Sequence, residues 1–221
     1  MSQQNLNERY SRQKDIVPIE RIAECKATVI GVGAIGRQVA AQLSAIGMQW
    51  IQLVDYDLVE ESNIASQGYF EDDLGRFKVH ATADICHQIN PKLELYTINE
   101  RFKRSMLTGN YIFCCVDKIE TRRHIWNTVK DKVKFFVDGR MSAEVLRVIT
   151  AYDEKSRRYY PQTLFPPEQA YAGPCTAKTT IYCANIAAGF MLAQFTKYLR
   201  LIAPDVDIQV NLLASEINVG G

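Results

Sequence analysis

The stretch that decides the fold is ATVIGVGAIG, residues 27–36, in which an apolar run leads into three glycines spaced as GxGxxG. We expect a buried strand over Ala27–Val32 and a helix over Ala34–Ile46, because apolar residues recur at helical spacing in the second segment. Glycines at such a turn let the backbone approach a phosphate, and the N-terminus of the helix then faces the anion. The stretch therefore predicts a nucleotide site. Its expected residues are Gly31, Gly33, Ala34, Ile35 and Gly36.

Strand and helix patterns alternate along the rest of the chain. We expect strands at Trp50–Asp55, Leu93–Ile98, Tyr111–Val116, Phe135–Asp138, Val145–Tyr152 and Val206–Leu213. Helices are expected at Ile16–Cys25, Gly75–Ile89, Glu120–Lys130 and Thr179–Leu201, and loops at Glu60–Leu74 and Tyr160–Pro174. This alternation predicts an α/β fold with a mostly parallel sheet. No repeat or shift of composition divides the chain, so we expect one domain over residues 1–221 with an N-terminal arm at residues 1–15.

Composition excludes several classes of protein. Lysine and arginine total 26 against 25 aspartate and glutamate residues, which gives a net charge of +1 and no general field to attract nucleic acid or acidic lipid. No apolar run approaches the ~18 residues of a membrane span, and Met1–Glu8 lacks an apolar signal core. We therefore expect a cytoplasmic protein. Its six cysteines include no CxxC pair, which predicts free thiols and no zinc site.

A carboxylate supports the nucleotide site. Asp55 ends the second expected strand, about twenty residues past the glycines, where a carboxylate accepts hydrogen bonds from both ribose hydroxyls. The alternative is a tight glycine turn that binds no ligand. The glycines and Asp55 together do not distinguish ATP from NAD.

Further motifs stand around this core in a fixed order. RYSRQ begins at Arg9, DYDLVEESNIASQ runs over residues 55–67, GRFK ends at Lys78, and VDKIETRR begins at Val116. Together they resemble the ThiF/MoeB/HesA superfamily, which includes the ubiquitin-activating enzymes. The pattern of that family is RYxRQ, GxGxxG, DxDxVxxSNxxRQ, GxxK and D(N)xxxR.

The resemblance implies a Rossmann-like fold that uses ATP and Mg²⁺ to adenylate the C-terminal carboxylate of a ubiquitin-like or sulfur-carrier protein. It assigns Lys78 to the phosphates, Asp117 to Mg²⁺, Asp55 to the ribose and Asn63 to the phosphate side. Arg12 corresponds to an arginine that reaches the triphosphate from the partner subunit, which implies a homodimer. Further nucleotide contacts are implied at Asp57, Ser66, Gln67 and Lys118. If each residue stood alone, a solvated surface charge would be the favoured interpretation of Lys78 and Arg12, and a turn residue that of Asp117. The joint spacing of the motifs argues against these interpretations.

One position departs from the family pattern. Ser66 stands where the family has an arginine, so a cation is missing beside the phosphates. Arg37, directly after the last glycine, is a candidate substitute. The alternative is that Arg37 is an exposed residue in the first turn of the helix.

The second half of the chain offers a candidate nucleophile. Cys175 lies in the segment 160–179, which resembles the loop of the acceptor cysteine in activating enzymes that form a thioester. A following helix N-terminus and Lys178 favour a lowered thiol pKa; simple packing is the alternative. Cys114, Cys115 and Cys183 are expected in the core. His80, Asp84 and His87 share a helix, but the two histidines would lie ~10 Å apart, too far for one ion.

We therefore expect a compact, zinc-free activating enzyme that passes a ubiquitin-like protein to Cys175 and then to a conjugating enzyme. It is similar to those of bacterial ubiquitin-like conjugation operons, some of which are linked to antiviral defence. Three alternatives stay open. They are a sulfur-carrier adenylyltransferase that stops at the acyl-adenylate, an NAD-dependent oxidoreductase, and a non-catalytic nucleotide-sensing module, which Ser66 favours.

Overall fold

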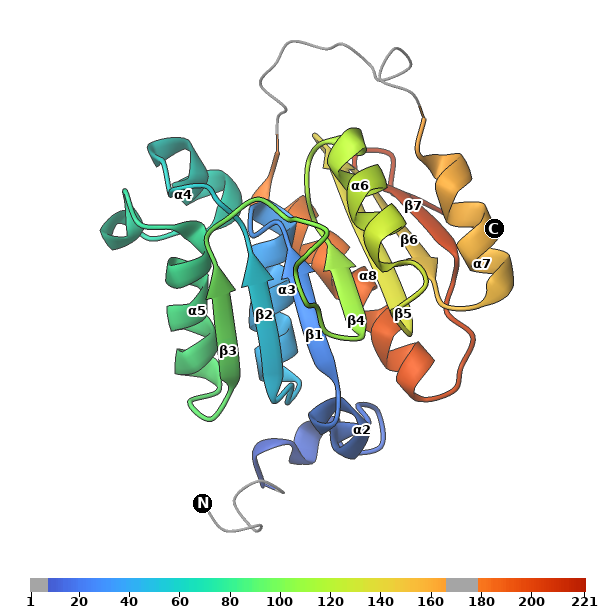
Figure 1. Cartoon of the computed structure of the whole chain (residues 1–221), viewed down its shortest axis with the longest axis horizontal. Helices are drawn as coiled ribbons and strands as arrows, with labels where there is room; N and C mark the ends of the chain where they lie inside the picture. Colours follow the sequence, from blue (N-terminus) through green and yellow to red (C-terminus); the bar gives the residue numbers. More distant parts are fainter. Residues whose placement is uncertain (1–7, 166–178) are drawn as a thin grey trace.

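The computed structural model describes residues 8–165 and 179–221. Eight strands form one sheet in the order β3-β2-β1-β4-β5-β6-β7-β8 (Figure 1). Their bounds are β1 (Lys26–Ile30), β2 (Trp50–Val54), β3 (Glu94–Ile98), β4 (Tyr111–Cys114), β5 (Phe135–Ser142), β6 (Val145–Ala151), β7 (Asp207–Asn211) and β8 (Glu216–Gly220). Pairing is parallel from β3 to β5 and antiparallel from β5 to β8. The expected α/β fold with its mostly parallel sheet is confirmed.

Helices cover both faces of the sheet. They are α2 (Ile19–Ala23), α3 (Ala34–Ala45), α4 (Glu61–Gln67), α5 (Lys78–Ile89), α6 (Ile119–Val129), α7 (Glu154–Tyr159) and α8 (Ile181–Leu199), with short 3₁₀ turns η1 (Ser11–Gln13), η2 (Glu71–Asp73) and η3 (Tyr160–Thr163). The larger apolar core lies against α3, α5 and α8, and includes Phe113 and Phe195. A second core on the opposite face joins Trp126 of α6 to Phe136 and Tyr160. Burial on both faces explains the apolar runs of the central strands.

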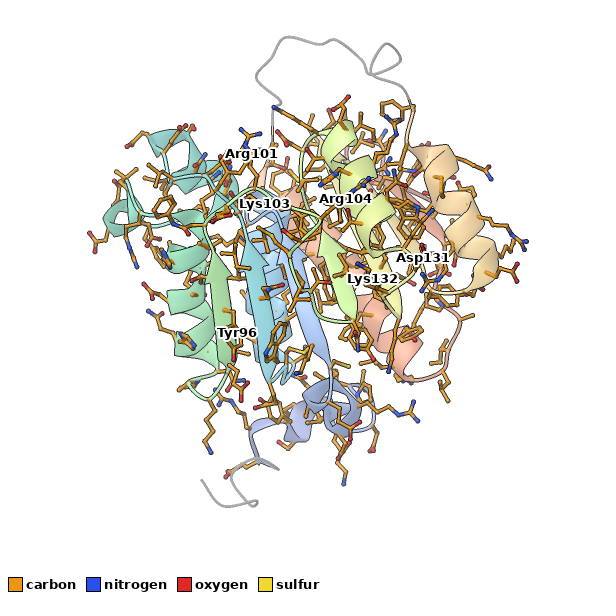
Figure 2. The ribbon with its side chains drawn as sticks, in the orientation of Figure 1. Tyr96, Arg101, Lys103, Arg104, Asp131 and Lys132 are labelled. Carbon is orange, nitrogen blue, oxygen red and sulfur yellow. The ribbon has the colours of Figure 1, made fainter. Side chains whose placement is uncertain are left out.

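The face of β1–β3 that lies away from α3 and α5 is covered differently. The β3–β4 connection crosses it without a helix (Figure 1). There Gln52 donates a hydrogen bond to the Leu107 carbonyl at 3.1 Å and accepts one from Thr28 at 2.9 Å. Figure 2 shows Arg101 and Lys103 along this connection, above Tyr96.

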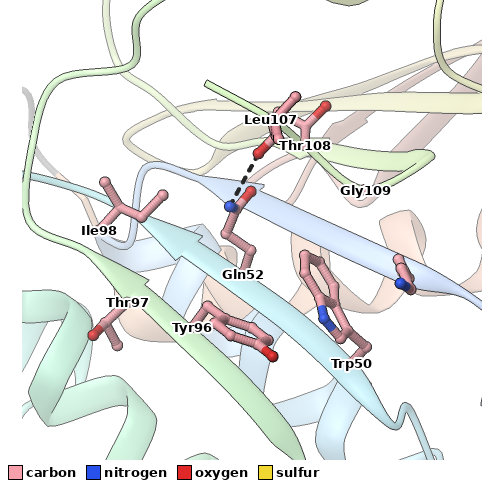
Figure 3. Close-up of a pocket in the computed structure, with 9 residues that line it drawn as sticks. Trp50, Gln52, Tyr96, Thr97, Ile98, Leu107, Thr108 and Gly109 are labelled. Carbon is pink, nitrogen blue, oxygen red and sulfur yellow. Dashed lines mark hydrogen bonds between the residues drawn. The ribbon is translucent and has the colours of Figure 1, made fainter. Parts of the chain in front are cut away.

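This face also holds a cavity of about 370 Å³ (Figure 3). The rings of Trp50 and Tyr96 lie in it with their centroids 5.3 Å apart. No residue that lines this cavity belongs to the glycine turn. It is therefore separate from the expected nucleotide site.

Several short elements differ from the sequence prediction. The predicted loop Glu60–Leu74 contains α4, because the Asn63 side chain accepts the Glu60 N–H at 3.0 Å and so caps its first turn. Helix α7 was not predicted either; the Asp153 carboxylate caps it by accepting the Ser156 N–H at 2.8 Å.

Other element boundaries also differ. Strand β5 extends past the predicted end at Asp138, and the exposed edge strand β8 was not predicted. The predicted helix Gly75–Ile89 begins only at Lys78, since Gly75 has φ +76° and Phe77 is extended. Among the residues that the structure describes, no helix is both long enough and apolar enough to cross a bilayer.

Candidate nucleotide site

The glycine turn lies where the strand order changes direction. Strands β2 and β3 follow on one side of β1 and β4 lies on the other, so a crevice opens at the carboxyl ends of β1 and β4. Gly31 has φ +85°, and a Cβ there would lie 2.8 Å from the Cys115 carbonyl oxygen. A Cβ on Gly36 would lie only 1.8 Å from the Gly31 carbonyl oxygen. These two contacts show that the protein's own backbone requires glycine at both positions, whether or not a ligand binds.

Asp55 joins the end of β2 to the glycine turn. Its carboxylate accepts hydrogen bonds from the backbone N–H of Val32 at 2.6 Å and of Asp57 at 2.9 Å. Burial raises the pKa of Asp55, and those two N–H groups oppose the shift. A carboxylate that has lost solvent gains from additional donors, and ribose hydroxyls are donors of that kind.

Lys78 lies close to a second carboxylate beside the same turn. The Lys78 side chain is only 8% exposed, and its Nζ lies 3.5 Å from Asp57 Oδ2. The Lys78 backbone N–H also donates to the Asp57 carbonyl at 3.0 Å. The first turn of α5 therefore holds a nearly buried cation next to the end of β2. The structure excludes the alternative that Lys78 is an ordinary solvated charge.

Helix α4 approaches the turn through Gln67. The Gln67 Oε1 atom is buried without a hydrogen-bond partner and would lie 3.6 Å from a Cβ on Gly33. Asn63 is buried and caps the helix, whereas the Ser66 hydroxyl donates to the Ser62 carbonyl at 2.6 Å. The Ser66 hydroxyl is thus used within α4, and this position supplies no cation beside the glycine turn. The unpaired polar atom of Gln67 is where a bound ligand would gain a partner.

Arg37 is not exposed in the first turn of α3, which was the alternative considered from the sequence. Its side chain is buried, its Nε donates to the Gly68 carbonyl at 3.0 Å, and its guanidinium lies 4.3 Å from the ring centroid of Tyr69. The exposed-residue alternative is wrong, because α4 and the residues after it cover the first turn of α3. Arg37 fixes the backbone that follows α4.

Tyr69 is a site residue that sequence reasoning missed. Its hydroxyl donates to the Val32 carbonyl at 2.5 Å and lies 3.1 Å from the Thr82 hydroxyl. It thereby ties the glycine turn to α5. None of the motifs quoted from the sequence extends to Tyr69, so no signal indicated this role.

Asp117 and Lys118 follow the carboxyl end of β4 and are exposed. Because β4 pairs with β1, both residues lie next to the glycine turn. An accessible carboxylate is the ligand type that Mg²⁺ prefers, so Asp117 fits a metal that accompanies a triphosphate. Among residues 8–165 and 179–221, no group of three or more His, Cys, Asp or Glu side chains is arranged to hold a metal by itself. His80, Asp84 and His87 are exposed on α5.

Arg12 lies far from the glycine turn of its own chain. It lies on η1, where the neighbouring Tyr10 packs against Gly47, beyond the C-terminal end of α3. Helix α3 has 12 residues and runs from the glycine turn to that end, a length of ~18 Å. The exposed Arg12 side chain therefore lies at the opposite edge of the sheet.

The candidate nucleophile Cys175 lies outside the described residues, as does Lys178. Of the cysteines that are described, Cys183 and Cys114 are buried as expected, whereas Cys115 is only partly buried. Burial raises the pKa of all three thiols. None of them has the lowered pKa of a reactive thiol.

Comparison with known proteins identifies the family. The ThiF family model matches residues 6–215. The chain belongs to the ThiF family. Ubiquitin-like modifier-activating enzyme 5 of Caenorhabditis elegans is 26% identical over 205 residues, which cover 81% of this chain and 49% of that protein. Molybdopterin-synthase adenylyltransferase of Salmonella typhimurium is 26% identical over 128 residues, covering 53% of this chain and 51% of the relative. The chain thus spans about half the length of these curated relatives.

Solved structures support the fold. A crystal structure of PaaA superposes with a TM-score of 0.79 at 20% identity, covering 100% of this chain and 84% of the other. The structure titled E. coli MccB with ATP superposes with a TM-score of 0.77 at 17% identity, covering 97% and 72% of the two chains. At these identities the superpositions establish the shared fold alone.

Proposed function

We propose that this ThiF-family chain uses ATP to adenylate the C-terminal carboxylate of a ubiquitin-like protein. The observation that carries the proposal is the grouping of Asp55, Lys78 and the glycine turn at the crevice between β1 and β4. Asp55 suits the ribose, and the N-terminus of α3 suits the phosphates. An NAD-dependent oxidoreductase would need the glycines and Asp55 but gives no role to Lys78 and Asp117.

The proposed reaction is a displacement at the α-phosphorus of ATP. A carboxylate oxygen of the carrier protein forms a bond to that phosphorus, and the bond to the β-phosphate oxygen breaks with its electron pair on pyrophosphate. Negative charge therefore accumulates on the departing group. The Lys78 ammonium suits this charge because the side chain is nearly buried next to Asp57. Little solvent therefore screens its attraction to the departing pyrophosphate.

Mg²⁺ would be held by Asp117, with Asp57 as a second carboxylate near the phosphates. When bound, the ion supplies screening of the triphosphate so that an anionic carboxylate can approach. The acidic residues themselves orient the nucleotide relative to the glycine turn. Nucleotide contacts by Asn63, Gln67 and Lys118 belong to the same proposal.

The proposal includes a two-fold homodimer. Arg12 lies at the edge of the sheet opposite its own glycine turn, so it reaches phosphates only in another subunit's site. A two-fold axis makes such an exchange reciprocal, with each subunit completing the other's site.

We further propose that the C-terminal acyl group of the carrier passes from AMP to Cys175. A carbon–sulfur bond forms there, the carbon–oxygen bond to AMP breaks, and the thiol proton goes to water. A conjugating enzyme then accepts the group, as in bacterial ubiquitin-like conjugation, including its antiviral-defence systems. If no thioester forms, the chain is a sulfur-carrier adenylyltransferase that stops at the acyl-adenylate. A non-catalytic nucleotide sensor is favoured only by Ser66.

Exchange of labelled pyrophosphate into ATP tests the proposal. Any small ubiquitin-fold protein that ends in a free glycine carboxylate and is encoded by a neighbouring gene is a candidate carrier for this assay. We expect exchange with one carrier, and its loss when the terminal carboxylate of that carrier is amidated. Nucleotide binding without exchange for any carrier would favour the sensor.

A further inference from the structure

A buried cluster of charged side chains lies beside the end of β4. Asp138 of β5 is fully buried and pairs in register with Cys114, the last residue of β4. Arg122 of α6 is only 4% exposed and forms an ion pair with Asp138 Oδ1. Arg140 Nη2 lies 2.8 Å from Oδ2, and the Tyr160 hydroxyl donates to the same oxygen at 2.9 Å. Two guanidinium groups and one hydroxyl thus hold a single carboxylate in place.

The burial of these charges needs a reason other than stability. Removing a guanidinium and a carboxylate from water costs free energy, and their mutual attraction often does no more than offset that cost. An apolar pair of similar volume would fill the space between α6 and β5 equally well. What a guanidinium adds is a set of N–H donors in a rigid plane, which fixes the position of each acceptor. The acceptors of Arg122 therefore indicate what the cluster holds in place.

Arg122 binds the backbone at the end of β4. It donates to the carbonyl of Val116, the residue directly before Asp117, and to the carbonyl of Gly139 on β5 at 3.3 Å. A peptide unit is planar, so a fixed Val116 carbonyl also fixes the N–H and the Cα of Asp117. The same backbone packs closely on the glycine turn, because a Cβ on Gly31 would lie 2.9 Å from the Val116 nitrogen. Val116 thus contacts the glycine turn through its nitrogen and α6 through its carbonyl.

We infer that Arg122 is a positioning residue, which fixes the backbone of Asp117 so that its carboxylate meets the metal that accompanies ATP. The inference rests on the proposed role of Asp117 in holding Mg²⁺. Asp117 is exposed at the start of the connection from β4 to α6. An exposed carboxylate on a loose connection loses conformational entropy when it binds a metal, and a backbone that is already fixed removes part of that cost. In this role Arg122 acts through Asp117 alone.

Calorimetric titration of the full chain with ATP, once in excess Mg²⁺ and once in EDTA, tests this role without any carrier. The ratio of the two dissociation constants gives the contribution of the metal to ATP binding. Arg122→Lys keeps a cation beside Asp138, but an ammonium lacks the planar fork that reaches Asp138 and Val116 together. We expect the ratio to fall about tenfold, as when a residue that orients a metal ligand is replaced, with the dissociation constant in EDTA unchanged. An Arg122→Lys protein with the wild-type ratio would overturn the inference.

Arg147→Lys is the matched control. Arg147 also pairs with a buried aspartate through two nitrogens, with its Nε 2.9 Å from Asp207 Oδ1, but on β6 and β7, which do not pair with β4. Both variants should unfold at a lower temperature than wild type, whereas only Arg122→Lys should change the ratio. An equal fall of the ratio in Arg147→Lys would assign the effect to stability and contradict a positioning role. Asp138→Asn, which keeps an oxygen acceptor but removes the charge that holds Arg122, is a second variant and should also lower the ratio.

A double variant separates this inference from the proposed function. Asp117→Ala should itself lower the ratio, because the metal loses its carboxylate. Arg122→Lys added to Asp117→Ala should lower it no further, since a residue that acts only through Asp117 then has nothing left to position. A wild-type ratio in Asp117→Ala would contradict the metal role in the proposed function, and the inference with it. A lowered ratio in Asp117→Ala with a further fall in the double variant would support that metal role and overturn the positioning role of Arg122.

Discussion

Replacement of Gly36 by alanine should disrupt the glycine turn. The new Cβ would lie 1.8 Å from the Gly31 carbonyl oxygen, whereas ordinary contacts begin at 3.4 Å. The start of α3 and the residue after β1 must therefore separate by about 1.6 Å. The clash cannot be relieved by a side-chain rotation, because the Gly31 carbonyl oxygen belongs to the backbone. Overpacking of this kind costs about 3 kcal/mol, which lowers the Tm of a chain this long by roughly 6–12 °C.

Gly189→Ala is the matched control, since nothing lies within 4 Å of a Cβ at that position in α8. Alanine is the better helix former, so this variant should gain about 0.8 kcal/mol. Thermal unfolding followed by circular dichroism measures both changes, and calorimetry measures ATP binding. We expect Gly36→Ala to lose ATP affinity as well as stability. A Gly36→Ala protein with wild-type Tm and wild-type ATP affinity would refute the packing argument.

Three further outcomes are expected. Burial alone would raise the pKa of Asp207, but its hydrogen bonds to Arg147 lower it below the ordinary value, so the native carboxylate stabilises the fold above pH ~4 and loses that contribution as the pH falls. Asp207→Asn should cost about 2 kcal/mol at pH 7 in urea unfolding, with the difference from wild type closing below pH ~4; a constant difference would contradict the assignment. Mixing inactive Arg12→Ala and Asp117→Ala chains should restore part of the exchange activity, because one site of a mixed dimer is whole, and no rescue after verified subunit exchange would remove Arg12 from the partner's site. Cys175→Ala should keep pyrophosphate exchange and lose the covalent carrier adduct, whereas a persistent adduct would place the nucleophile at another cysteine.

The fold was predictable wherever burial imposed a clear pattern. Strands β1, β2 and β4 are apolar runs bounded by residues that favour turns. Helix α3 follows a glycine motif in which Gly31 and Gly36 leave no room for a Cβ. Elements held by local polar bonds escaped prediction. Helix α4 depends on an Asn63 cap inside a polar stretch, and β8 is an exposed edge strand that depends on pairing with β7.

The sequence indicated some of the residues that gather at the glycine turn but not how they are arranged. The spacing of the motifs indicated Asp55 and Lys78, yet the sequence did not reveal that Lys78 is nearly buried next to Asp57. Arg37 was weighed as a surface residue because its neighbours in the fold, Gly68 and Tyr69, are distant in sequence. The buried pairing of Asp138 with arginines of α6 and β5 was likewise invisible, since tertiary packing alone brings those groups together.

Calorimetric titration of the full chain with Mg-ATP and, separately, with NAD tests the central claim most directly. ATP should bind in preference to NAD, since Lys78 and Asp117 suit a metal-bound triphosphate and the N-terminus of α3 suits its anionic charge. Asp55→Ala should weaken ATP binding, because the ribose loses its acceptor. Micromolar binding of NAD with no binding of ATP would contradict the assignment of this site to adenylation.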